Sequence, residues 1–140
     1  FKALLDTGNR LYDPLTRTPV IIMEASIWRD LLPDGWCDKL REQSADQLLA
    51  DEDGAAAASP WSGRFRFVPY RGVGGKPRMM LAVKPDVVSL SQNGQPSRCV
   101  TKALIGLDGG VLSSDGVYRA VLHPDMTQAA GRSQAPSQPA

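Results

Sequence analysis

The residues best suited to chemistry stand near the start of the chain, in Leu4-Leu5-Asp6-Thr7-Gly8. An apolar pair followed by Asp-Thr-Gly is typical of a strand that ends in a turn, where aspartate caps the backbone and glycine takes a positive φ. It is also typical of a loop that presents a catalytic carboxylate. From this motif alone, both interpretations stand.

Two further glycine-containing segments follow along the chain. Gly72, Val73, Gly74 and Gly75 lie between two strand-like runs, which predicts a hairpin with a mobile tip able to close over a cleft. Leu104-Ile105-Gly106 ends a later predicted strand. The order of the three motifs resembles that of the retroviral-type aspartic proteases, in which each subunit supplies one lobe and one aspartate.

Paired carboxylates explain why such a site needs these residue types. Two carboxyl groups held about 3 Å apart share one proton, so one acts as base toward water while the other acts as acid toward the peptide carbonyl. They titrate as a pair. Because the chain holds a single Asp-Thr-Gly, the second Asp6 must come from a symmetric copy, so the mechanism requires a homodimer.

The supporting motif residues have expected roles in the same site. Thr7 would hydrogen-bond across the two-fold axis, and Gly8 would let the two loops approach. Leu104, Ile105 and Gly106 would support the catalytic loop from behind. The flap over the substrate would be formed by Gly72, Val73, Gly74 and Gly75.

Longer blocks give a narrower resemblance, to the sporulation sigma-E factor-processing peptidases of spore-forming Firmicutes. The blocks are residues 4–16, 68–75, 81–86 and 118–125. The resemblance implies an aspartic endopeptidase with Asp6 as its catalytic residue. It also implies a pro-sigma factor (pro-sigma-E) as substrate and a secreted forespore activator protein.

The same resemblance implies a location. Members of the family join a membrane-embedded N-terminal half to a cytoplasmic protease half, in the cell membrane at the sporulation septum. The sequence opens on Phe1 without a methionine, so we expect an upstream part to be missing. Whether this segment is active without that part stays open.

The predicted fold is mostly β, with little helix: a retropepsin-like lobe built on a closed β-sheet. Strands are expected at residues 3–5, 19–23, 64–68, 79–83, 87–90 and 99–105, with a hairpin turn at Asn93-Gly94. A helical turn is expected at 26–32 and a last helix at 116–122. We expect a protease domain over 1–130, a surface insertion at 33–63 and a disordered tail at 131–140.

Composition excludes several other classes of protein. The chain of 140 residues is 42% hydrophobic and 22% charged, and its formal net charge is +1, which argues against binding to nucleic acid through bulk charge. No run of 18 apolar residues occurs. Two cysteines, Cys37 and Cys99, and one histidine, His123, are too few for a metal cage, and no cofactor is expected.

Two other functions compete with that of a peptidase. The Gly72–Lys76 stretch lacks the spacing of a phosphate loop, and Pro77 stands where Ser or Thr would bind magnesium. The serious rival is a catalytically silent retropepsin-like module for dimerisation or peptide binding. An Asp6→Asn variant separates the two, because only a peptidase loses its activity.

Overall fold

A computed structural model of the protein describes residues 2–6, 8–33, 35–42, 60–61, 63–71, 73–92 and 96–126. The described residues are mostly β with little helix, as predicted. The strands are β1 (Ala3–Leu5), β2 (Tyr12–Asp13), β3 (Thr18–Glu24), β4 (Phe65–Arg71), β5 (Pro77–Val83), β6 (Val88–Leu90), β7 (Arg98–Val100), β8 (Leu104–Asp108) and β9 (Ala120–Leu122). The helical segments are η1 (Ala25–Leu31), α1 (Trp36–Glu42) and η3 (Val73–Gly75).

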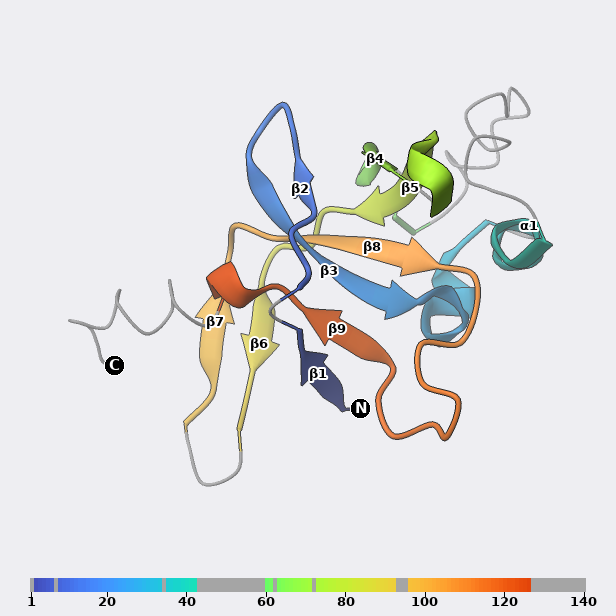
Figure 1. The fold of residues 1–140 in the computed structure, drawn as a ribbon. Coiled ribbons are helices and arrows are strands. Elements are labelled where there is room, and N and C mark those ends of the chain that lie inside the picture. The colour runs from blue at the N-terminus through green and yellow to red at the C-terminus, as the bar shows by residue number, and fades with distance from the viewer. Residues whose placement is uncertain are drawn as a thin grey trace.

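One mixed sheet organises the chain. Its seven strands run in the order β1-β9-β3-β8-β5-β4, with β2 paired to β3, while β6 and β7 form a separate two-stranded sheet. Pairs β3–β8 and β1–β9 are parallel, and the other pairs in the order are antiparallel. Figure 1 shows β9, β3 and β8 crossing the middle of the molecule side by side.

Strand β3 lies at the centre because its sequence suits burial on both faces. Five of its seven residues are buried, so the apolar run at residues 20–23 has no alternation. Its Val20 packs with Val68, Ala82 and Leu104, and Leu11 adds to this cluster. These contacts connect the central strand to the β4–β5 hairpin.

The closed sheet expected from the sequence is not formed by hydrogen bonds among the described strands. Strands β1 and β4 are the two ends of the order. Side-chain packing brings the β4 side toward β2 instead, because Leu11 joins the cluster that contains Val68 of β4. The β4–β5 hairpin itself is confirmed, with Arg71 opposite Pro77 at its tip end.

The predicted helix at 116–122 is wrong. Residues Ala120–Leu122 form strand β9, which inserts between β1 and β3. Pairing on both sides satisfies the backbone of this short segment and buries Ala120, which outweighs any local helical tendency. The predicted strand at 99–105 is likewise two strands, β7 and β8, which lie in different sheets, so Leu104-Ile105-Gly106 begins β8 and does not end a strand.

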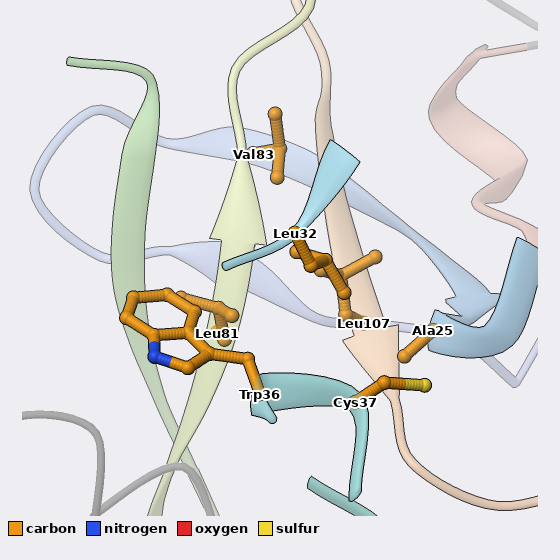
Figure 2. Packing of buried hydrophobic residues seen from close by; sticks show 7 residues of the cluster. All are labelled: Ala25, Leu32, Trp36, Cys37, Leu81, Val83 and Leu107. Atoms are coloured by element: carbon orange, nitrogen blue, oxygen red, sulfur yellow. The ribbon is translucent and has the colours of Figure 1, made fainter. Parts of the chain in front are cut away.

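Part of the range predicted as a surface insertion belongs to the core. In α1, Trp36 and Cys37 are 3% and 7% exposed, and they pack with Leu81 and Leu107 of the sheet (Figure 2). A Cβ on Gly109 would lie 2.0 Å from the carbonyl oxygen of Leu40, so helix and strand end are in close backbone contact. The helix is therefore a core element.

Residues 43–59, the largest part of that range, lie outside the described residues, as do the Asn93-Gly94 turn and the tail at 131–140. The domain limits stay predictions. No helix among the described residues is long and apolar enough to cross a membrane.

Candidate functional site

Asp6 follows directly after β1 and presents its side chain at the surface. Its backbone N–H donates to the carbonyl oxygen of Leu122 at 3.4 Å, and its own carbonyl oxygen accepts the N–H of Asn9 at 3.0 Å. Its Oδ1 accepts the N–H of Gly8 at 2.8 Å. The carboxylate is thus exposed to solvent but fixed in orientation by a tight turn.

Gly8 leaves room for the Asp6 carboxylate. It does not have the positive φ expected of a turn glycine. A Cβ at this position would lie 3.2 Å from Oδ1 of Asp6, which is closer than most real Cβ contacts. A side chain at Gly8 would therefore push on the carboxylate that its N–H holds.

Asn9 anchors this turn to the core. The side chain is 7% exposed, and its Nδ2 donates to the carbonyl oxygen of Val20 at 3.0 Å. Its Oδ1 accepts the N–H of Leu11 at 3.1 Å, and Leu11 in turn accepts the N–H of Val20 at 3.0 Å. The motif Asp-Thr-Gly does not by itself reveal this role, although an asparagine directly after it is a candidate for such a contact.

The Leu104-Ile105-Gly106 motif lies behind that anchor. Strand β8 runs parallel to β3, with Leu104 opposite Val20. A Cβ on Gly106 would lie 2.9 Å from Cγ1 of Val20 and 2.4 Å from Sδ of Met80. The motif thus packs against the strand that holds Asn9, and its expected support of the Asp6 loop stays a prediction.

The glycine-rich tip has the backbone of a tight turn. Gly74 and Gly75 adopt φ values of 78° and 77°, which favour glycine. Nη1 of Arg71 donates to the carbonyl oxygen of Gly75 at 3.0 Å across the turn. The flap role of the tip stays a prediction, and both Gly72 and Thr7 lie outside the described residues.

Exposed apolar residues directly precede Asp6 in the chain. Leu4 and Leu5, directly before Asp6, are 42% and 47% exposed. A hollow of about 220 Å³ opens beside them, between β1, β9 and the β6–β7 sheet. It is lined by Ala3, Leu5, Leu90, Ser91, Gln92, Pro96, Arg98 and Leu122. An exposed carboxylate next to apolar side chains suits a site that is covered by a peptide or by a second protomer.

A polar cluster that sequence reasoning missed lies next to the same turn. The Tyr12 hydroxyl donates to Oδ2 of Asp125, and the Tyr12 and His123 rings meet edge to face at 4.6 Å. The backbone N–H of Asp125 donates to Nδ1 of His123 at 3.0 Å. No local sequence signal marks this cluster, because Tyr12 and Asp125 are 113 positions apart.

The surroundings of Tyr12 and His123 shift the pKa of each group. The hydrogen bond to Asp125 raises the pKa of Tyr12. Burial lowers the pKa of His123, against the attraction of the Asp125 carboxylate. Within the described part of the chain, no group of three His, Cys, Asp or Glu side chains is placed to hold a metal ion.

Comparison with known proteins gives consistent matches. Residues 1–126 match the family model described as sporulation factor SpoIIGA. Over 125 residues the chain is 37% identical to the sporulation sigma-E factor-processing peptidase of Priestia megaterium and 35% identical to that of Bacillus subtilis. Each of these alignments covers 89% of this chain and 39% of the relative.

A third relative is more nearly matched in length. It is a protein of Bacillus thuringiensis subsp. kurstaki whose name marks it as a candidate sporulation sigma factor-processing peptidase. It is 37% identical over 123 residues, which cover 88% of this chain and 73% of the relative. No solved structure shows a significant match to the chain.

Proposed function

The chain belongs to the sporulation factor SpoIIGA family of peptidases, and on that premise we propose that it is an aspartic endopeptidase that removes the pro-segment of pro-sigma-E. The observation that carries the aspartic assignment is the placement of Asp6. Its carboxylate is exposed, yet the backbone on both sides is hydrogen-bonded to Leu122 and Asn9. A catalytic group needs this combination of access and fixed position.

The proposed chemistry uses two copies of Asp6. One carboxylate takes a proton from water while its mate, protonated, donates to the carbonyl oxygen of the scissile peptide bond. The N–H of Gly8 holds Oδ1 of Asp6, which sets the plane of the carboxylate. A retropepsin-like arrangement, with the Gly72–Gly75 tip as flap, would exclude water from the bound peptide.

A homodimer is proposed because a single chain supplies one such carboxylate. The exposed side chains of Leu4 and Leu5 beside Asp6 support it, since apolar surface next to a catalytic group favours coverage. Strand β1 pairs with β9 alone among the described strands, so its other edge is open to a partner strand.

The experiment is co-expression of the protein with pro-sigma-E, with Asp6 intact or replaced by Asn. Asp6→Asn should abolish processing at unchanged protein level while binding of pro-sigma-E in a pull-down persists. The matched control is Asp86→Asn, because the Asp86 carboxylate is 84% exposed and pairs with Arg64 on the surface. Processing by the Asp6→Asn variant would refute the assignment.

The rival function has its own outcome in the same experiment. A silent dimerisation or peptide-binding module would bind pro-sigma-E in both forms and cleave it in neither, with the activator supplied. The secreted forespore activator and the location at the septal membrane stay predictions of the family resemblance. Fractionation of sporulating cells, followed by immunoblotting, tests the location.

A further inference from the structure

The segment at residues 122–125 contacts both ends of the stretch from Asp6 to Tyr12, which is called the Asp6 loop below. At the start of the loop, the carbonyl oxygen of Leu122 accepts the N–H of Asp6. At its end, the ring of Tyr12 packs on His123, and its hydroxyl donates to Asp125. A shift of this segment would therefore be transmitted to the carboxylate from both directions.

His123 is the centre of that segment. Its residue surface is 1% exposed, and its Nδ1 accepts the N–H of Asp125 at 3.0 Å. An Nδ1 that accepts a hydrogen bond carries no proton, so the ring is the neutral tautomer with its proton on Nε2. Nε2 is buried without a hydrogen-bond partner among the described residues.

We propose that His123, in its neutral form, is a positioning residue for Asp6. It acts through Leu122 and Tyr12, the residues that bracket the Asp6 loop. The inference rests on the proposed peptidase function and extends it, because it adds a residue on which activity depends without contact with the substrate.

Protonation of His123 would disturb the arrangement. A proton on Nδ1 displaces the N–H of Asp125, and the new charge is buried. The charged groups that act on the ring are Asp125, whose Oδ1 lies 3.9 Å from Nδ1, and Arg10, which opposes a second positive charge. Burial lowers the pKa of His123 below its ordinary value of 6.5, so the ring stays neutral near neutral pH.

The test measures processing rates of pro-sigma-E by the purified full-length protein, over a range of pH and substrate concentration. His123→Leu removes the acceptor for the Asp125 N–H. His123→Asn can keep an acceptor there and does not titrate. We expect kcat to fall about tenfold in His123→Leu with KM nearly unchanged, since Asp6 acts on bond cleavage. His123→Asn should regain much of the rate.

The pH profile supplies a readout that a purely structural role would not move. In the wild-type protein, the rate should fall in acid as His123 becomes protonated. His123→Asn should lack that decrease, because asparagine does not titrate. Amide hydrogen exchange at Asn9 should be faster in His123→Leu, which reports on the loop itself whatever the activity.

Controls separate this inference from the proposed function and from lost stability. Val83→Ala removes buried volume from the core cluster that contains Trp36 and Cys37 of α1, away from the Asp6 loop. The kcat of each variant is measured equally far below its own melting temperature. If Val83→Ala loses as much kcat as His123→Leu, or if His123→Asn keeps the wild-type pH profile, the positioning role is refuted. If Asp6→Asn still cleaves, the proposed function fails instead.

Discussion

The side-chain amide of Asn9 donates a hydrogen bond at 3.0 Å to the carbonyl oxygen of Val20, which lies in the central strand β3. Asn9 is three residues from Asp6, and its own N–H closes the turn on the Asp6 carbonyl oxygen. The candidate catalytic turn is therefore fixed to the most buried strand of the sheet. Rigid support of this kind is what a catalytic carboxylate needs.

Replacement of Asn9 by Ala should lower both stability and processing. The change leaves the Val20 carbonyl oxygen and the Leu11 N–H without the partners that Asn9 supplies. A lost buried hydrogen bond costs about 1–3 kcal/mol, measured as the free energy of unfolding in urea. Lys39→Ala, at an exposed position of α1, is the control and should stay within about 0.5 kcal/mol of wild type. Equal stability of both variants would contradict the anchor.

Replacement of Gly106 by Ala should destabilise the protein by overpacking. The added methyl group would meet Sδ of Met80 at 2.4 Å and Cγ1 of Val20 at 2.9 Å. Overpacking in a filled core costs about 1–3 kcal/mol. At Gly110 the same methyl would lie 3.4 Å from a carboxylate oxygen of Asp108, so Gly110→Ala should unfold at nearly the wild-type temperature. Thermal melts followed by circular dichroism compare the two, and a reversed order would refute the prediction.

Glu24 should give the protein a distinct loss of stability in acid. Its buried carboxylate accepts the N–H of Leu112 at 3.0 Å and Nε of Arg119 at 2.9 Å. These hydrogen bonds, the one from Leu112 foremost, lower the pKa of Glu24 below 4.5. The folded state thus binds this proton more weakly than the unfolded state. The stabilisation is present above pH 4.5 and is lost as the pH falls through the lowered pKa.

A Glu24→Gln variant tests this pH dependence. Its melting temperature should be lower than that of the wild type at neutral pH and should fall less steeply below about pH 4.5. Asp86→Asn removes an exposed carboxylate and should keep the steep wild-type limb. If the melting temperature of Glu24→Gln falls in acid as steeply as that of the wild type, other carboxyl groups govern acid unfolding.

Mixing experiments should reveal whether the site is shared between two copies of Asp6. If one active site needs two aspartates, equal amounts of wild-type and Asp6→Asn protein, allowed to exchange, should give about a quarter of the wild-type specific activity. Independent sites would give about half. The readout is processing of pro-sigma-E per total protein, with Asp86→Asn replacing Asp6→Asn in the control mixture.

Local sequence patterns determined much of the secondary structure of this protein. The apolar pair and Asp-Thr-Gly predict a strand followed by a turn, and β1 with the Asp6 turn has that form because the signals lie within a few residues. The β4–β5 hairpin and the buried strand β3 follow from alternation and from a β-branched apolar run in the same way. The single Asp-Thr-Gly also predicts an active site shared between two copies of the chain, which stays a prediction.

Only the tertiary structure decided the long-range arrangements. Residues 120–122 have no local strand signal of their own, and they extend because β1 and β3 offer hydrogen bonds on both sides. Trp36 stands in a polar stretch, and its burial depends on a sheet face formed by strands β4, β5 and β8, which come later in the chain. The contacts of Tyr12 with His123 and Asp125 likewise arise when β9 returns beside β1. Short stretches of sequence indicate the secondary-structure propensities of such segments. They do not indicate the tertiary contacts that override these propensities.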